Sequence, residues 1–132
     1  MNNFIRTTVI SLLLATATTA AYADGVEGVW RTESSDEGYL HVSIAPCDNA
    51  LCGTIIGAYN LEDQANETYE YLGKNMVWDM KSVGEVMWKN GKIWDPTNDK
   101  TYKSKMTLDG DVLSVSGCVL MFCRSQDWTR VD

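Results

Sequence analysis

Short stretches of alternating apolar and polar residues, separated by turn residues, occupy most of the chain after position 24. In the stretch 38–45, for example, Leu40, Val42 and Ile44 share one face of an extended segment. An alternation of period two over four to eight residues is typical of β-strands that are buried on one face. The pattern therefore predicts strands throughout this part of the chain, and it shows no convincing amphipathic helix.

The predicted strands follow one another closely. Asn90-Gly91 and Asp109-Gly110 have the composition of two-residue hairpin turns. The acidic stretch 61–67 lacks a strand pattern and is expected to be a loop or a short helix. Eight or nine strands joined by hairpins predict one antiparallel barrel or sandwich, and an up-and-down barrel leaves no free sheet edges. The expected strands are 26–33, 38–45, 53–59, 76–83, 85–89, 92–94, 101–108, 112–117 and 124–131.

The first 23 residues have a different pattern, that of an export signal. Arg6 is their only charge, an apolar stretch covers 9–15, and small residues lead to Ala21-Tyr22-Ala23. The apolar stretch is too short to cross about 30 Å of hydrocarbon. We therefore expect cleavage after Ala23, which leaves residues 24–132 as a single small domain in the periplasm or outside the cell.

Two cysteine pairs, Cys47/Cys52 and Cys118/Cys123, have identical spacing and lie between strand-like stretches. This spacing suits a bridge across the end of a β-hairpin, where the Cβ atoms of facing residues lie within disulfide reach. A zinc site with four thiolates is the alternative. Export favours disulfides, because exported proteins fold in an oxidising compartment. Each bridge would stabilise the domain by about 2 kcal/mol if its geometry is unstrained.

The charge balance excludes some partners. The chain carries a net charge of −7, and loss of Arg6 with the export signal makes it more negative. Such a surface repels nucleic-acid phosphates and anionic lipid head groups. No second apolar stretch is long enough to cross a bilayer. We therefore expect neither a nucleic-acid partner nor stable membrane insertion.

Signals for catalysis are weak. His41 is the single histidine and lies in the middle of a predicted strand, without a partner motif. The sequence contains no nucleophile elbow, metalloprotease helix or phosphate loop. The acidic stretches 62–67 and 95–99 match no calcium-loop spacing. The sequence therefore predicts no enzymatic activity, no metal and no cofactor.

Methionine and aromatic residues are concentrated between positions 76 and 106. Such side chains are typical of apolar pockets, but they also fill solid cores, and the interior of an eight-stranded barrel permits both. On 76–80 the strand period places Met76, Trp78 and Met80 on the inner face. If a cavity is present, its expected lining is Trp78, Met80, Trp88, Trp94, Tyr102 and Met106.

Several motifs, taken together and in order, resemble an exported bacterial family known as domain of unknown function 2147. The resemblance covers nearly all of residues 24–132. The matching pieces are Gly28-Val29-Trp30, Cys47 to Gly53, Asn90-Gly91-Lys92-Ile93 with Asp95-Pro96, Lys100-Thr101-Tyr102, and Gly117-Cys118 followed by Cys123 to Arg130.

This resemblance implies a lipocalin-like β-barrel without an established catalytic activity. In such barrels a tryptophan of the first strand packs under an arginine of the last strand and closes one end. Here the motif Gly28-x-Trp30 would pack under Arg124 or Arg130, and a ligand would enter at the other end. The expected function is binding of a small apolar or amphipathic molecule in the cell envelope. A solid-cored envelope protein that recognises a protein partner is the alternative.

Overall fold

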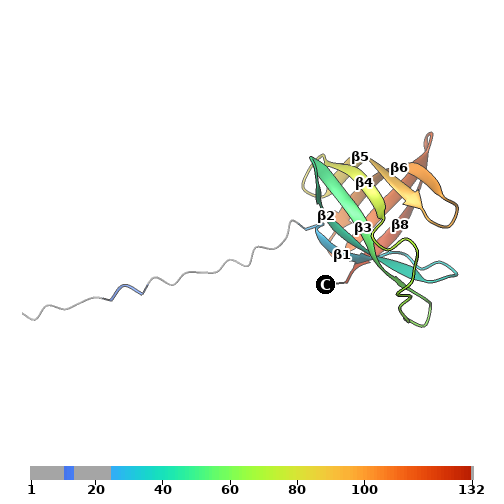
Figure 1. Ribbon diagram of the computed structural model, residues 1–132. Helices are drawn as coiled ribbons and strands as arrows, with labels where there is room; N and C mark the ends of the chain where they lie inside the picture. Colours follow the sequence, from blue (N-terminus) through green and yellow to red (C-terminus); the bar gives the residue numbers. More distant parts are fainter. Residues whose placement is uncertain (1–10, 14–24, 132) are drawn as a thin grey trace, which may run out of the picture.

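The computed structural model describes residues 11–13 and 25–131. Most of the expected export signal, including the cleavage site after Ala23, lies outside the described residues. The domain is a closed antiparallel barrel in which the strands follow one another in chain order (Figure 1). The strands are β1 (Gly28–Arg31), β2 (Tyr39–Cys47), β3 (Ala50–Tyr59), β4 (Asn75–Ser82), β5 (Met87–Asp95), β6 (Lys100–Asp109), β7 (Val112–Val119) and β8 (Phe122–Arg130).

The all-β, up-and-down barrel predicted from the alternation is confirmed, but the hairpin turn expected at Asn90-Gly91 is wrong. β5 runs through both residues and pairs with β4 on either side of them, at Lys89 and at Lys92. Asn90 has a φ of 62°, so the dipeptide forms a bulge inside the strand. Gly91 is buried there, and a Cβ on it would lie 2.4 Å from the Met80 sulfur. The glycine is therefore explained by close packing across the strands.

A second irregularity overturns the expected alternation on 76–80. Val77, not Trp78, is fully buried, and Met80 is buried three residues later. Asp79 between them has a φ of 55°, which breaks the period of two. Trp78 pairs with Lys92 and is half-buried on the outer face of β4.

One end of the barrel is closed by Trp30 and an arginine, as the resemblance implies, and the arginine is Arg130. Its guanidinium lies 4.3 Å from the centroid of the Trp30 ring. The Trp30 indole N–H donates to the Val26 carbonyl at 2.8 Å. Arg130 also donates to the carbonyls of Gly25 and Glu27. These contacts attach the segment before β1 to the end of β8.

The packed core fills the barrel next to this closed end. Trp128 is completely buried, and its indole N–H donates to the Gln126 side chain at 2.7 Å. The other fully buried side chains come from the segment before β1 and from β1, β2, β3, β4, β6 and β7. They are Val26, Trp30, Val42, Ile44, Ile55, Val77, Met80, Met106, Leu113 and Val115.

Both predicted disulfides are present. Cys47–Cys52 joins the ends of β2 and β3, and Cys118–Cys123 joins the ends of β7 and β8. Because both bridges engage all the cysteines of the chain, no thiolate is left for the alternative zinc site. The two bridges lie at opposite ends of the barrel, since the β2–β3 and β7–β8 hairpins point in opposite directions.

The close packing at Gly91 generates a stability prediction. Gly91→Ala places a methyl group against the Met80 side chain and the Trp78 carbonyl, so it should destabilise the fold by about 1–3 kcal/mol. Gly84→Ala is the matched control: its Cβ meets nothing within 4 Å, so its effect should stay within about 0.5 kcal/mol. Urea unfolding followed by tryptophan fluorescence measures both. Equal effects would contradict the assigned packing.

Candidate ligand-binding cavity

The end of the barrel opposite Trp30 is hollow. The loops that join β1 to β2, β3 to β4, β5 to β6 and β7 to β8 surround a cavity of about 870 Å³. We call this end the mouth. The volume falls within the range of about 300–1,000 Å³ that is usual for small-molecule sites. The barrel therefore contains both a packed core and a ligand-sized cavity, the latter at the mouth.

The cavity wall is mostly apolar, and one wall position has no side chain at all. Gly117 pairs with Ser104 on the inner face of β7. A Cβ on Gly117 would meet Ile93 at 3.5 Å and Tyr102 at 3.6 Å, which are ordinary contact distances. Gly117 therefore leaves space that a larger side chain would occupy. The apolar and aromatic side chains that border the cavity include Leu40, Ala58, Met76, Ile93, Trp94, Tyr102, Val119 and Phe122.

Charged side chains lie at the rim of the cavity. Glu33, Glu37 and Asp95 supply carboxylates, and Asp95 accepts hydrogen bonds from the Thr97 N–H and hydroxyl. Arg124 is the only cation among the lining residues, and it pairs with Gly117 in the sheet. Within residues 25–131, Arg124 forms no ion pair. The rim thus offers three carboxylates and one cation without an ion-pair partner among the described residues, beside an apolar wall.

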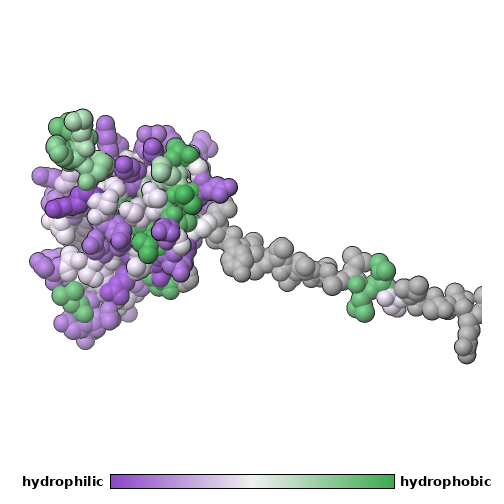
Figure 2. All heavy atoms as spheres, turned by 180° about the vertical axis from the view of Figure 1, so that it is seen from behind, coloured by the Kyte–Doolittle hydropathy of each residue, from purple (hydrophilic) through white to green (hydrophobic). Residues whose placement is uncertain are grey.

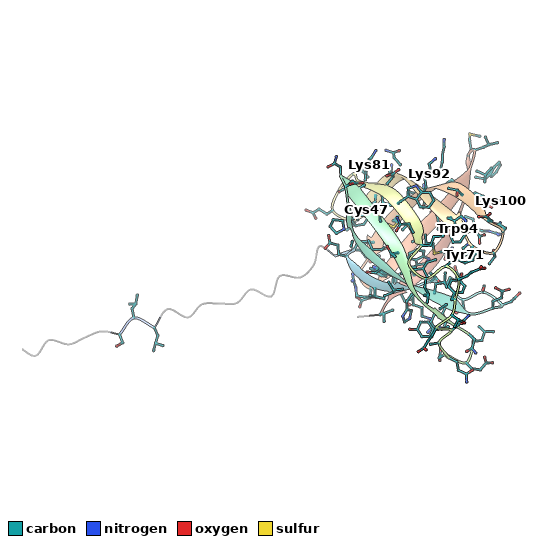
Figure 3. All side chains as sticks on the ribbon, in the orientation of Figure 1. Cys47, Tyr71, Lys81, Lys92, Trp94 and Lys100 are labelled. Atoms are coloured by element: carbon teal, nitrogen blue, oxygen red, sulfur yellow. A yellow bond between two sulfur atoms is a disulfide. The ribbon has the colours of Figure 1, made fainter. Side chains whose placement is uncertain are left out.

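The segment between β3 and β4, residues 60–74, is held beside the mouth by Trp94. The Tyr71 ring meets the Trp94 ring edge-on, with centroids 4.9 Å apart (Figure 3). The Lys74 ammonium lies 3.4 Å from the centroid of the Trp94 ring. The indole N–H donates to Asp99 at 2.8 Å. Trp94 therefore ties this segment to β5 and to the β5–β6 loop.

Tyr69, from the same segment, adds a hydrogen-bonding group to the cavity lining. Burial is the main cause that raises the pKa of its phenol above the ordinary value of 10.0. Tyr69 is therefore protonated at neutral pH and presents a hydroxyl group to the cavity.

The residues expected to line a cavity are divided between several places. Trp94 and Tyr102 border the cavity at the mouth. Met80 and Trp88 border a second, smaller cavity of about 550 Å³ near the closed end. Met106 is completely buried in the core. Sequence reasoning did not identify Leu40, Ala58 and Gly117 as cavity residues, although the alternation of β2 was a usable signal for Leu40.

Arg124, the other arginine considered for the contact with Trp30, does not lie at the closed end. Arg124 lies at the mouth, in the first half of β8, whereas Arg130 lies at the end of the same strand over Trp30. Gly28, the other residue expected at the closed end, has a φ of 129°, a conformation that favours glycine.

His41 lies on the outer face of β2 and does not line the cavity. Its ring centroid is 4.4 Å from that of Tyr59 and 5.8 Å from that of Tyr39. The Arg31 guanidinium lies 3.7 Å from the Tyr39 ring centroid. Burial first, and the charge of Arg31 second, hold the pKa of His41 below its ordinary value of 6.5. The imidazole is therefore mostly neutral at neutral pH.

Residues 11–13 and 25–131 contain no group of three or more His, Cys, Asp or Glu side chains arranged to hold a metal ion. Over the same residues, no helix has the length and apolar character needed to cross a membrane.

A closed eight-stranded barrel with a cavity at one end and a Trp–Arg contact at the other defines a lipocalin-like protein. Residues 28–130 match the family described as "Uncharacterized protein conserved in bacteria (DUF2147)", and the chain belongs to this family. Its fold is similar to that of protein HP1028 from Helicobacter pylori, described as a member of the lipocalin family. The TM-score is 0.64 at 14% identity, covering 80% of this chain and 82% of that one. The search of curated proteins found no match.

The surroundings of His41 generate a titration prediction. Because the folded-state pKa is lowered, the unfolded chain binds more protons below about pH 6.5, and the domain should lose stability on acidification through that range. Arg31→Gln should raise the His41 pKa only part of the way to 6.5, since burial is the larger cause. NMR titration of the single imidazole measures this directly, with Arg124→Gln as the control. A wild-type pKa at or above 6.5 would contradict the structure.

Proposed function

We propose that this protein binds a small amphipathic molecule in the cell envelope or outside the cell. The observation that carries the proposal is the cavity of about 870 Å³, with an apolar wall and a charged rim. The two disulfides support a site of action in an oxidising compartment. The cavity also argues against the alternative of a barrel with a completely solid core.

The apolar part of the ligand would occupy the space between Leu40, Met76 and Ile93. Each buried methylene group contributes about 0.8 kcal/mol. A chain of about eight methylenes would therefore supply several kcal/mol, from which the entropy lost on binding is subtracted. The empty position at Gly117 extends this space toward β7.

The head group of the ligand would lie at the rim and be acidic. Arg124 has no ion-pair partner among the described residues, whereas Asp95 is already held by Thr97. Glu33 and Glu37 lie on the β1–β2 loop and are exposed, as Arg124 is, so water screens all three charges. A charge-assisted hydrogen bond from Arg124 to a carboxylate or phosphate would contribute about 1.5–3 kcal/mol.

The proposed function is binding without catalysis. His41 is the only histidine of the chain, and it lies on the outer face of the barrel. The serines that line the cavity, Ser35 and Ser125, therefore have no imidazole base beside them. Cys123 is engaged in a disulfide and offers no thiolate nucleophile.

Filling the cavity should abolish binding. Gly117→Leu places a side chain into the open space, and its Cβ starts from ordinary contact distances, so the barrel should still fold. Gly84→Leu makes the same change at an open position of the β4–β5 connection. Native mass spectrometry of protein isolated from its own cells should show a bound molecule on the wild type and on Gly84→Leu only. A bare wild-type mass, or the same ligand retained on Gly117→Leu, would contradict the proposal.

Removing the rim cation should weaken only acidic ligands. Arg124→Gln should lower the affinity for hexadecanoic acid by about tenfold or more, because a charge-assisted hydrogen bond is lost. The affinity for hexadecanol, which has the same chain without the charge, should change less than twofold. Displacement of a fluorescent probe from the cavity measures both. Equal losses for the acid and the alcohol would show that Arg124 does not hold the head group.

A further inference from the structure

The hairpin between β7 and β8 ends in four consecutive exposed apolar residues, which we call the apolar tip. Val119, Leu120, Met121 and Phe122 are 55%, 92%, 91% and 79% exposed. The tip forms a protrusion at one corner of the molecule (Figure 2). Contiguous exposed apolar side chains are unusual on a soluble protein and mark sites of interaction.

The tip is also held in one shape. The Cys118–Cys123 disulfide closes the hairpin directly behind it. Leu120 has a φ of 55°, a conformation in which glycine or asparagine costs less than leucine. A large apolar residue therefore occupies a position where the backbone alone favours a small or polar one. Leu120 is 92% exposed, so packing within the described domain does not compensate for the cost of this backbone conformation.

A group of lysines lies on the outer face of β4, β5 and β6, and we call it the lysine face. Lys81 pairs directly with Lys89, and Lys92 pairs directly with Lys103. Like charges in directly opposed positions destabilise a sheet. None of these lysines forms an ion pair within residues 25–131. Figure 3 labels two of its members; the full group is Lys81, Lys89, Lys92, Lys103 and Lys105.

The apolar tip and the lysine face are continuous. Lys103 pairs with Cys118 of β7, and Cys118 pairs with Cys123 of β8. Lys92, Lys103 and Cys118 thus form one row across three neighbouring strands, which are about 4.8 Å apart. The apolar tip begins at the residue after Cys118. Five lysines of an acidic chain are therefore gathered on one face, next to the exposed apolar residues of the tip.

We propose that the apolar tip and the lysine face together form a docking surface for a membrane that contains anionic lipids. The tip would enter the boundary between head groups and acyl chains, and the lysines would contact the lipid phosphates. Each lysine close to an anionic surface strengthens binding about fivefold. An anionic bilayer offers negative charge next to an apolar phase. A soluble anionic polymer would leave the tip in water.

This proposal modifies one expectation from the sequence. The net charge of −7 predicts repulsion from anionic lipid heads, but the lysine face presents the opposite charge locally. Docking of this kind does not span the bilayer. It would bring the mouth of the barrel to the lipid, because Val119 and Phe122 also line the cavity. The docking surface does not depend on whether the cavity holds a ligand.

Vesicle flotation tests the proposal, with protein isolated from its own cells in a single processed form. The wild type should float with vesicles of phosphatidylethanolamine and phosphatidylglycerol, less so as salt increases, and not with phosphatidylcholine alone. Leu120→Asn with Met121→Ser should lower binding about tenfold or more. Lys92→Gln with Lys103→Gln should do the same. Val83→Ser with Val86→Ser, which removes two exposed apolar side chains from the β4–β5 connection, should change binding less than twofold.

Other results would overturn it. The proposal is wrong if the wild type does not bind the anionic vesicles. It is also wrong if the Val83/Val86 control loses as much binding as the tip variant. Tight binding to double-stranded DNA that depends on Lys92 and Lys103 but not on the tip would indicate a soluble polyanion as the partner. A dimer that dissociates when the tip is changed would indicate a second copy of the chain. None of these results would alter the outcome for Gly117→Leu, so failure of the docking surface is distinguishable from failure of the cavity.

Discussion

The contact between Trp30 and Arg130 is the constraint on which the rest of the barrel depends. In the described part of the chain, β1 and β8 are paired at two positions, Trp30 with Arg130 and Arg31 with Thr129. The Val131 N–H adds a hydrogen bond to the Val29 carbonyl. So short a seam would leave two sheet edges almost free. The buried indole under the guanidinium, the hydrogen bond to Val26 and the ion pair with Asp111 strengthen it on both sides. These side chains meet at the closed end of the barrel, next to the packed core. At the opposite end, the loops surround the cavity.

Two glycines at the same level of the inner wall show that one residue type can have a packed or an open environment. Gly91 of β5 and Gly117 of β7 both pair with Ser104 of β6, the strand that lies between them. The space at Gly91 is filled by Met80, which a bulge at Asp79 turns toward the interior. No side chain fills the space at Gly117, and the cavity begins there. The distribution of volume in the barrel therefore follows from the positions of the bulges as much as from the sizes of the side chains.

These bulges also explain which parts of the molecule could be predicted from the sequence. Alternation over many residues is a redundant signal, so the strands, the antiparallel barrel and both disulfides were predictable. A bulge depends on one residue, and Asn90-Gly91 has the composition of a hairpin turn. The bulge can be distinguished from a turn only by the packing of Met80, on β4, against Gly91, and this contact is not visible in the local sequence. The cavity was less predictable for a similar reason. Aromatic and methionine density does not indicate which end of a strand lies at the mouth, and so Trp88 and Met80 border one cavity while Tyr102 borders the other.

The two disulfides have the same spacing but stabilise different features. Cys47–Cys52 closes a hairpin beside the smaller cavity, whose lining includes Leu51 and the buried Met80 and Trp88. Cys118–Cys123 closes a hairpin whose tip has no packing of its own, since Leu120 and Met121 are almost fully exposed. A flexible hairpin could fold its apolar side chains back over the mouth, where Val119 and Phe122 already line the cavity. By restricting that movement, the second bridge would serve both the proposed ligand site and the proposed docking surface beside it.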